Sequence, residues 1–417
     1  MSIVKPSKLG VISGPGTEAF SSKVLKHLRK LYTIRYKKLS SALAKRHEMG
    51  ETEILKFVTL IEDLNNKRIP HNKPASTYQA LNLEIPVRYT KFANGEVKAE
   101  ILQSVRSLRV FIIYDLSIQY PVHIFGPDEP EILSINDHLM FLYNTINAVN
   151  VAGAESVQLV LPTYPYSRQH KKSGREALTA SWFGHICEFM GVDRIITLDI
   201  HSREIENSFH TLRLENLHAS YQILLQLKKL VNFDDPDLAV VSPDTGAILR
   251  NKFYAESLQK PLALLYKERD YSKISRNANN TNIKVVKLLG EVEGKTVFMA
   301  DDMIGTGGTL LTAMREIRKC GAKKIICAIS LPFFNKNSIE VFDEAYKSGL
   351  FYRIIGTNAV YHDQTLLSKE WYIHTDVSDL FARIISRLHH GRSLSPLLDN
   401  RKFIQNLINV NNEKKGT

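Results

Sequence analysis

The chain has 417 residues, of which 44% are hydrophobic and 24% charged, and its formal net charge at pH 7 is +12. This composition is typical of a globular protein, and the length predicts two domains with ample core. The sequence contains no apolar run long enough to cross a bilayer and no signal-peptide pattern, and its three cysteines lack metal-ligand spacing. We therefore expect a cytoplasmic protein with no membrane partner and no disulfide scaffold.

The first distinctive segment is basic, with lysines and arginines recurring from Lys23 to Arg46. A nucleic-acid-binding face would carry such charge, but so would the solvated surface of a helix. No recognised nucleic-acid module accompanies the segment, so we expect a helix surface and no nucleic-acid partner. The stretch from 33 to 83 is charged and amphipathic in patches, and it looks like an inserted helical segment.

Short apolar runs alternate with helical patterns along the rest of the chain. The strand-like runs are 110–114, 157–161, 195–198, 238–241, 297–300, 325–329 and 352–355. Helical patterns lie between them, for example at 136–150, 178–190, 217–230 and 309–319. This alternation predicts an α/β architecture with parallel sheets, and a seam near residue 217 would give two domains of similar size.

Polar side chains follow several of these runs. Arg168 and Gln169 come after the run at 157–161, His201 follows Asp199 after the next run, and Asp244 follows the run at 238–241. Open parallel sheets bind ligands at the carboxyl ends of their strands. His201 alone would often be a structural histidine, and Asp244 alone a cap, but several such strand ends together indicate a site. An aspartate and a histidine can also meet a divalent metal.

Residues 267–283 show almost no apolar periodicity and are rich in asparagine. A long polar loop within a compact domain is often functional. Because it carries the cations Lys267 and Arg269, we interpret it as a mobile lid that closes over phosphates. A plain surface loop is the alternative.

The most informative segment is 297–309. Its apolar run ends in two adjacent carboxylates, Asp301 and Asp302, and a turn of small residues follows before a helical pattern: Gly305, Thr306, Gly307, Gly308 and Thr309. Glycines let several backbone N–H groups point at one anion, and the helix start adds a favourable dipole. Because acids cannot bind phosphate, they more plausibly hold sugar hydroxyls or a metal ion. The acid pair and the glycine turn together predict a sugar phosphate as ligand.

Other readings of this segment are weaker. A Walker loop would need a lysine after the glycines, and a Rossmann turn would need the spacing G-x-G-x-x-G. The remaining alternative is that the glycine-rich turn is purely structural and the acids are solvated.

Taken together, these motifs resemble those of the ribose-phosphate pyrophosphokinase family. Further marks of that family occur in the same order: Phe92-Ala93-Asn94-Gly95-Glu96, Asn136-Asp137-His138-Leu139-Met140, Gly191-Val192-Asp193-Arg194, Gly290-Glu291-Val292-Glu293-Gly294-Lys295 and Ser393-Leu394-Ser395. The resemblance implies two phosphoribosyltransferase-like domains, each with a mainly parallel sheet flanked by helices. We expect them at 1–217 and 218–396, with inserts at about 33–83 and 117–134 and a C-terminal extension at 397–417.

The resemblance also implies the reaction, in which ribose 5-phosphate and MgATP give 5-phosphoribosyl diphosphate and AMP for nucleotide biosynthesis. On this reading the loop 305–309 binds the 5-phosphate and the acid pair binds the ribose hydroxyls. Lys267 and Arg269 are the expected catalytic cations. Mg²⁺ is the expected cofactor, organised by His201 and Asp244. The expected ATP-binding residues are Phe92, Asn94 and Glu96 from an adjacent subunit, together with Arg168, Gln169 and His201. The family is usually a hexamer built from dimers, so we expect a homo-oligomer.

Some positions depart from the family pattern. Gly305 stands where the family usually has aspartate, and His170 follows Gln169 where the family usually has aspartate. Two other functions therefore remain open at this point. One is a catalytically silent homologue that binds nucleotide and regulates an active synthetase, and the other is a phosphoribosyltransferase. Neither accounts as well for the retained motifs on both the ATP side and the sugar side.

Overall fold

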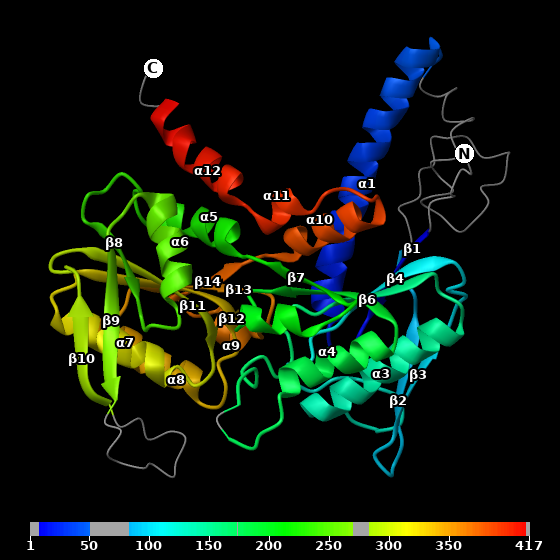
Figure 1. The fold of residues 1–417 in the computed structure, drawn as a ribbon, viewed down its shortest axis with the longest axis horizontal. Helices are drawn as coiled ribbons and strands as arrows, with labels where there is room; N and C mark the ends of the chain where they lie inside the picture. Colours follow the sequence, from blue (N-terminus) through cyan, green and yellow to red (C-terminus); the bar gives the residue numbers. More distant parts are fainter. Residues whose placement is uncertain (1–7, 51–82, 173, 270–282, 414–417) are drawn as a thin grey trace. The chain divides into compact units, whose positions relative to one another are not determined.

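The computed structural model describes residues 8–50, 83–172, 174–269 and 283–413 (Figure 1). Contacts divide the chain into two compact units. Unit 1 takes its described residues from 1–217 and 378–398, and unit 2 takes them from 218–377 and 399–417.

Unit 1 is built on a parallel sheet with strand order β1–β4–β5–β6–β7. The interior strands are nearly continuous apolar runs, as expected for a parallel sheet covered on both faces. The strands are β1 (Lys8–Ser13), β4 (Leu108–Ile113), β5 (Ser156–Val160), β6 (Val192–Leu198) and β7 (Arg213–Leu217). The helical elements are α1 (Glu18–His47), α3 (Ile135–Val151), α4 (Thr179–Phe189), the 3₁₀ turn η2 (Arg203–Ser208), α10 (Ser378–His389) and α11 (Ser395–Leu398).

An antiparallel hairpin, β2 (Val87–Lys91) and β3 (Val97–Ile101), belongs to the same unit. The segment expected as an insert at 117–134 lies beside it. Phe125 exchanges backbone hydrogen bonds of 2.8 Å with Tyr89 and Lys91, and Lys91 Nζ lies 2.8 Å from a Glu131 carboxylate oxygen. This segment therefore supports the hairpin from one side. Of the other expected insert, α1 covers the first part and residues 51–82 lie outside the described residues.

Unit 2 contains a sheet with strand order β10–β9–β8–β11–β12–β13–β14, in which only β10 is antiparallel to its neighbour. Helices α5 and α6 lie on one face of this sheet, and α7 and α8 on the other (Figure 1). The strands are β8 (Leu238–Ser242), β9 (Leu262–Arg269), β10 (Ile283–Leu289), β11 (Thr296–Ile304), β12 (Lys324–Pro332), β13 (Arg353–Thr357) and β14 (Tyr372–Thr375). The helices are α5 (Ser220–Leu230), α6 (Ile248–Leu258), α7 (Gly308–Lys319), α8 (Ser338–Lys347), α9 (Gln364–Leu367) and α12 (Arg401–Glu413).

The connections of this second sheet reverse direction between β8 and β11. From β8 the chain passes through α6 to β9 on one side, and from β11 it passes through α7 to β12 on the other. Such a switch point opens a crevice at the carboxyl ends of the two strands, where open α/β sheets bind ligands. The expected α/β architecture with mainly parallel sheets is therefore confirmed.

The units do not follow the expected domain boundaries at their C-terminal ends. Helix α10 groups with unit 1, because the Phe381 ring packs edge-on against Phe20 of α1 at 5.4 Å and Asp379 lies 3.8 Å from His27 of the same helix. Helix α12 groups with unit 2, where Lys228 of α5 donates a 2.6 Å hydrogen bond to the Leu407 carbonyl. The sequence after β14 thus returns to unit 1 before ending in unit 2.

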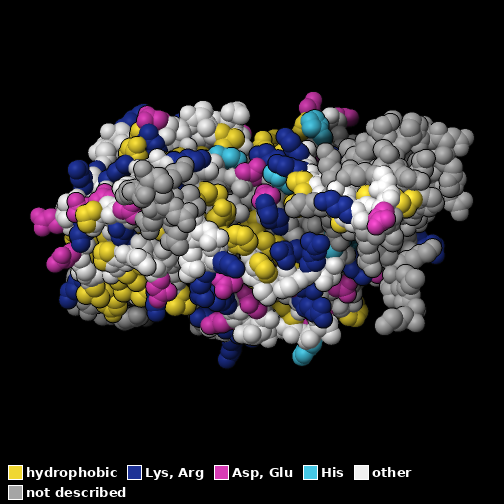
Figure 2. Space-filling model, turned by 90° about the horizontal axis from the view of Figure 1, so that it is seen from above, with side chains coloured by type: hydrophobic (Ala, Val, Ile, Leu, Met, Phe, Trp, Pro, Cys, Tyr) yellow, Lys and Arg dark blue, Asp and Glu magenta, His cyan; other side chains and the backbone are white. Residues whose placement is uncertain are grey.

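No helix among the described residues is long and apolar enough to span a membrane. On the face drawn in Figure 2, lysine and arginine side chains are interspersed with acidic and apolar ones. Such mixing is usual for a protein surface.

The contact between α1 and α10 gives a test of the discontinuous unit. Phe381 is fully buried, so Phe381→Ala should lower the free energy of unfolding by about 3–5 kcal/mol, as large-to-small changes in cores do. Phe403 is 46% exposed, and Phe403→Ala should change the free energy of unfolding by less than about 1 kcal/mol. Urea unfolding of both variants measures the difference, and equal effects would contradict a core that includes α10.

Candidate functional site

The carboxyl end of β8 leads into a turn that fixes Asp244. One Asp244 carboxylate oxygen accepts a 3.0 Å hydrogen bond from the Ala247 N–H, and the Ser242 hydroxyl donates a 2.7 Å bond to the Asp244 carbonyl. These local bonds hold the turn at the start of α6. Asp244 therefore lies at the switch point of unit 2, as its position after a strand predicted.

The two acids of the central motif lie inside β11. We expected the strand to end at Ala300, but it continues to Ile304 because pairing with β12 extends to Ile304 opposite Pro332. Pairing with β8 stops earlier, at Phe298. Asp301 and Asp302 thus occupy a stretch of strand that has a neighbouring strand on one side only. This open edge faces the switch point.

Burial and mutual repulsion act on this acid pair. Asp302 is 8% exposed, and its carboxylate accepts a 2.8 Å bond from the Met303 N–H, while Asp301 accepts a 2.9 Å bond from the Asp302 N–H. Burial, followed by the charge of Asp302, raises the pKa of Asp301 well above its ordinary value, and Asp244 adds to this effect. Arg250 on α6 opposes it. A ligand that offers positive charge or hydrogen-bond donors would relieve this repulsion.

The turn after β11 is shaped by contacts with an aromatic core. Gly307 has φ of +77°, and a Cβ built there would lie 2.2 Å from the Phe342 ring. The Asn335 N–H donates a 3.0 Å bond to the Gly305 carbonyl, and the Phe333 N–H donates a 2.9 Å bond to Ile304. Asn335 and Phe342 carry no sequence signal for this role, because their link to the loop arises only from the packing of β12 and α8.

Helix α7 starts directly behind this turn. Gly307 is its N-cap residue and provides no side-chain hydrogen bond, and the first turn contains no acidic residue. The first amides of a helix have no partner within the helix, and with the helix dipole they attract anions. Thr306, Gly308 and Thr309 are exposed beside them. The turn and helix start can therefore accept a phosphate group.

Lys267 and Arg269 lie elsewhere than the sequence analysis expected. We placed them in a polar loop, but their backbones belong to β9, where Lys267 pairs with Val286 and Arg269 with Ile283 of β10. The pairing with β10 is not visible in the composition of residues 267–269, so these polar residues alone did not indicate a strand. The part of the expected lid from 270 to 282 lies outside the described residues.

In unit 1, two loops bring the other expected residues together. The His170 and His201 rings lie 5.2 Å apart, and Lys171 forms an ion pair of 3.2 Å with Glu204 of η2. Gln169 adjoins His170, and its N–H donates a 2.7 Å bond to the Tyr166 carbonyl. Thus Arg168 and Gln169 after β5 share one edge of the sheet with His201 after β6.

Both of these loops contain a residue in the left-handed backbone region. Tyr166 has φ of +54° and Asp199 has φ of +42°. Non-glycine residues adopt this conformation only where surrounding contacts impose it, often at functional sites. Around Asp199, its N–H donates a 2.8 Å bond to Leu217, and the Ile200 N–H donates a 3.0 Å bond to the Asn216 side chain. The loop that carries His201 is therefore fixed to β7.

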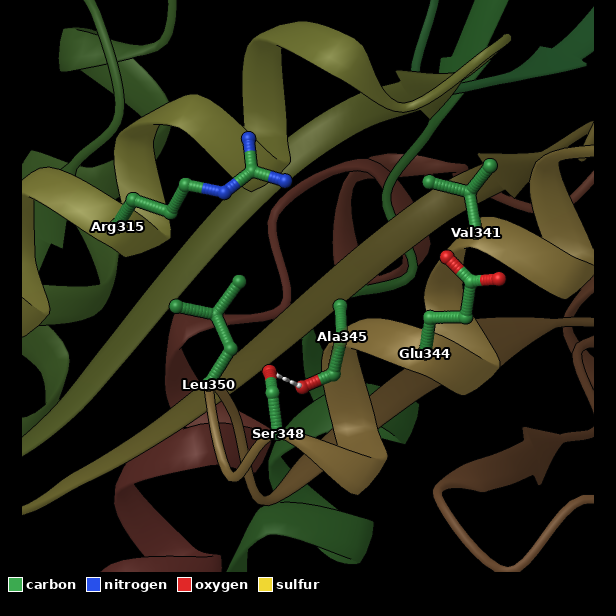
Figure 3. Close-up of a pocket in the computed structure, with 6 residues that line it drawn as sticks. All are labelled: Arg315, Val341, Glu344, Ala345, Ser348 and Leu350. Carbon is green, nitrogen blue, oxygen red and sulfur yellow. Dashed lines mark hydrogen bonds between the residues drawn. The ribbon is translucent and has the colours of Figure 1, made fainter.

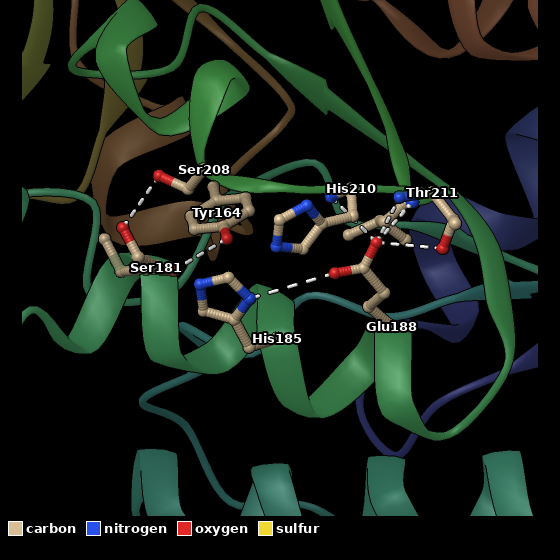
Figure 4. Close-up of polar contacts among 9 residues, drawn as sticks. Tyr164, Ser181, His185, Glu188, Ser208, His210 and Thr211 are labelled. Carbon is tan, nitrogen blue, oxygen red and sulfur yellow. Dashed lines mark hydrogen bonds and ion pairs between the residues drawn. The ribbon is translucent and has the colours of Figure 1, made fainter.

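Glu188 at the end of α4 anchors the return of this loop to β7 (Figure 4). One of its oxygens accepts hydrogen bonds from the N–H groups of His210, Thr211 and Leu212 and from the Thr211 hydroxyl. These bonds lower the pKa of Glu188 to about 2. The carboxylate thus acts as a charged clamp for residues 210–212.

The residues expected to reach a neighbouring subunit lie in the β2–β3 hairpin. The Phe92 N–H donates a 2.8 Å bond to the Glu96 carbonyl, and the Glu96 N–H donates a 3.1 Å bond to the Asn94 side chain. Gly95, with φ of +89°, completes the turn. Phe92 is 48% exposed, so the hairpin presents an aromatic ring to its surroundings.

A separate cavity of about 270 Å³ lies between α7 and α8 (Figure 3). Arg315 and Glu344 face it over an apolar floor of Val341, Ala345 and Leu350. None of the expected site residues lines it. It is therefore distinct from the turn at 305–309.

The expected metal-organising residues lie in different units, His201 in unit 1 and Asp244 in unit 2. Within the described residues no group of three or more His, Cys, Asp or Glu side chains could hold a metal by itself. Magnesium usually binds through one or two carboxylates together with substrate phosphates. Asp244 supplies one such carboxylate after the end of β8, so this residue fits an ion that substrate phosphates would share.

The chain is similar to known proteins along most of its length. The chain matches the family described as the N-terminal domain of ribose phosphate pyrophosphokinase at residues 75–191, and the phosphoribosyl transferase domain at residues 210–367. It is 32% identical to ribose-phosphate pyrophosphokinase 2 of Schizosaccharomyces pombe over 314 residues, which covers 75% of this chain and 88% of that protein. It is 33% identical to ribose-phosphate pyrophosphokinase 4 of Saccharomyces cerevisiae over 308 residues, covering 74% of this chain and 85% of that protein.

A solved structure shares the fold. The chain superimposes on phosphoribosylpyrophosphate synthetase from Mycobacterium smegmatis with a TM-score of 0.66 and 22% identity, covering 92% of this chain and 99% of that one.

Gly307→Ala should destabilise the protein by at least about 2 kcal/mol, because it combines a left-handed backbone with a contact on the Phe342 ring. Gly308 is the matched control, since a Cβ there would meet nothing within 4 Å and its φ is ordinary. Gly308→Ala should change the free energy of unfolding by less than about 1 kcal/mol. Urea unfolding compares the two, and equal stability would contradict the packing described for this turn.

Asp301→Asn should stabilise the protein increasingly as the pH rises. The carboxyl ionises at its ordinary value near 3.8 in the unfolded chain, but its pKa in the folded protein is well above that. The free energy of unfolding of the wild type should therefore fall relative to that of the variant above pH 3.8, until the folded pKa is passed. Urea unfolding across a pH series measures the gap, and a gap independent of pH would contradict the proposed repulsion.

Proposed function

Because this chain belongs to the ribose-phosphate pyrophosphokinase family, we propose that it transfers the diphosphoryl group of MgATP to ribose 5-phosphate. The products are 5-phosphoribosyl diphosphate and AMP. The anomeric hydroxyl of the sugar attacks the β-phosphorus of ATP, the new oxygen–phosphorus bond forms, and AMP leaves. The activity would serve nucleotide biosynthesis in the cytoplasm.

The acid pair followed by an uncapped helix start is the observation that carries this proposal. The turn 305–309 and the first amides of α7 bind the 5-phosphate, while Asp301 and Asp302 accept hydrogen bonds from the ribose hydroxyls. A sugar phosphate matches both halves, since its anionic end suits the amides and its hydroxyls suit the acids. Sugar binding also stabilises the ionised form of Asp301, whose pKa is raised in the free protein.

The ATP-binding residues are assigned to unit 1. Arg168 offers a planar, permanently charged group to phosphate oxygens, and Gln169 offers an amide that both donates and accepts. His201 lies beside this segment through its ring contact with His170. Phe92, Asn94 and Glu96 complete the adenine site of an adjacent subunit, and the exposed ring of Phe92 suits such a contact. The protein would accordingly act as a homo-oligomer built from dimers, with a hexamer as the expected form.

The transfer step depends on charge neutralisation more than on covalent chemistry. Lys267 and Arg269 are the cations assigned to stabilise the transferring diphosphoryl group. His201 on the ATP side and Asp244 on the sugar side are the residues assigned to magnesium, which when bound would neutralise phosphate charge. Removing one cation of this kind typically lowers the rate about 10²–10³-fold.

Release of AMP from purified protein tests this function. With MgATP and ribose 5-phosphate, AMP should appear together with 5-phosphoribosyl diphosphate, and omitting the sugar should abolish both. The expected ratio of the two products is one to one. AMP formation that does not depend on ribose 5-phosphate, or no AMP at all while ATP still binds, would contradict the proposal.

Gly305→Asp tests the loop where the chain departs from the family pattern. Gly305 is the residue of the turn that directly follows β11, on the side of the acid pair and away from the α7 amides. A carboxylate added there offers a further acceptor for a sugar hydroxyl, so KM for ribose 5-phosphate should fall about three- to ten-fold. Gly308→Asp is the matched control, because an acid at the first residue of α7 should repel the 5-phosphate and raise this KM. Steady-state assays measure both values, and a rise for both variants would contradict the assignment of sugar and phosphate ends.

A further inference from the structure

Strand β11 loses its partner on the β8 side just before the acid pair. The last residue of β11 that pairs with β8 is Phe298, opposite Val240. β8 itself ends at Ser242, where the chain turns towards Asp244, and yet Ala300 is only 2% exposed. A buried backbone N–H and carbonyl without partners would destabilise this stretch strongly. Something other than a strand must satisfy them.

The side chain of Asn251 on α6 does so. Its amide oxygen accepts a 2.8 Å bond from the Ala300 N–H, and its amide nitrogen donates a 2.8 Å bond to the Ala300 carbonyl. In an extended strand the N–H and C=O of one residue point the same way, so one planar carboxamide can pair with both. Asn251 thus replaces a neighbouring strand at the residue directly before Asp301.

The same amide links the Asp244 turn after β8 to the acid-bearing part of β11. Its second N–H donates a 2.9 Å bond to the Ala247 carbonyl, and the Ala247 N–H donates to the Asp244 carboxylate at 3.0 Å. A continuous series of hydrogen bonds therefore runs from Asp244 through Ala247 and Asn251 to Ala300, the residue before Asp301. All three hydrogen bonds of the Asn251 side chain lie in the protein interior, since Asn251 is 0% exposed.

From this arrangement we infer that Asn251 is a positioning residue for sugar-phosphate binding. It holds the free edge of β11 and the Asp244 turn in one register, and so fixes where the carboxylates of Asp301, Asp302 and Asp244 lie. It touches no substrate itself. The inference rests on the proposed function, because it assigns the acid pair to the ribose hydroxyls. A buried asparagine in a helix interior is unfavourable by itself, which supports a role beyond filling space.

Asn251→Leu tests this role, since leucine has a similar size but cannot pair with Ala300. The matched control is Asn400→Leu in the same unit, because Asn400 is 9% exposed and its amide donates a 2.8 Å bond to the Ser220 hydroxyl, away from the acid pair. Both variants lose a buried amide and should have lower unfolding midpoints in urea. Only Asn251→Leu should change sugar binding.

The readouts are the dissociation constants of ribose 5-phosphate and ATP by calorimetry, together with steady-state KM and kcat. For Asn251→Leu we expect the dissociation constant and KM of ribose 5-phosphate to rise ten-fold or more, because displacements near 1 Å can lower activity about 10²-fold. The values for ATP should stay within about two-fold of wild type, within the scatter expected of unrelated sites. Asn400→Leu should leave all of them within the same two-fold range.

The inference would be overturned if Asn251→Leu and Asn400→Leu bind ribose 5-phosphate with equal affinity. It would also be overturned if Asn251→Leu loses as much affinity for ATP as for ribose 5-phosphate. If Asn251→Leu does not fold, Asn251→Ser replaces it, because one shorter hydroxyl cannot pair with both Ala300 groups, and the same comparison applies. Calorimetry separates the two claims. If wild-type protein binds ribose 5-phosphate but forms no AMP, the proposed function is refuted. The binding comparison of Asn251→Leu with Asn400→Leu still tests the positioning role of Asn251. Wild-type protein that binds no ribose 5-phosphate would overturn both.

Discussion

Burial of the adjacent carboxyl groups of Asp301 and Asp302, together with their mutual repulsion, is the constraint on which the candidate site of unit 2 depends. Burial and the neighbouring carboxylates Asp302 and Asp244 together raise the pKa of Asp301. A buried cluster of acids destabilises a fold by itself and is often found at functional sites, which supports the proposal that a ligand binds here. Sugar hydroxyls are suitable ligands, because they donate hydrogen bonds to carboxylates without requiring a second buried charge.

The surrounding elements hold this unfavourable arrangement in place. Asn251 pairs with the backbone of Ala300 just before the acids, and Asn335 binds the Gly305 carbonyl just after them. The Phe342 ring fills the space that a side chain at Gly307 would need. The acid pair and the turn at 305–309 are therefore held in place by contacts on both sides, before Asp301 and after Asp302. This rigidity suits a reaction whose catalysis comes from positioning and charge.

Much of this site could be predicted from the sequence, because its signals are local. The acid pair, the glycine turn and the helix at 308–319 are contiguous, and an apolar run marks the strand before them. Features set by pairing between strands could not be predicted. Strand β11 continues past its apolar run because β12 accompanies it, and Lys267 and Arg269 lie in a strand because β10 pairs with them. Asn251 carries no sequence signal at all, since its role exists only where α6 meets β11. The grouping of α10 with unit 1 likewise depends on its contact with α1.

A crystal structure of the protein with ribose 5-phosphate would show where the two ends of the sugar phosphate lie. The 5-phosphate should accept hydrogen bonds from the amides of Gly307, Gly308 and Thr309, and ribose hydroxyls should donate to Asp301 and Asp302. The sugar phosphate bound elsewhere, or bound with its phosphate away from α7 and its hydroxyls clear of both carboxylates, would contradict the proposed binding mode.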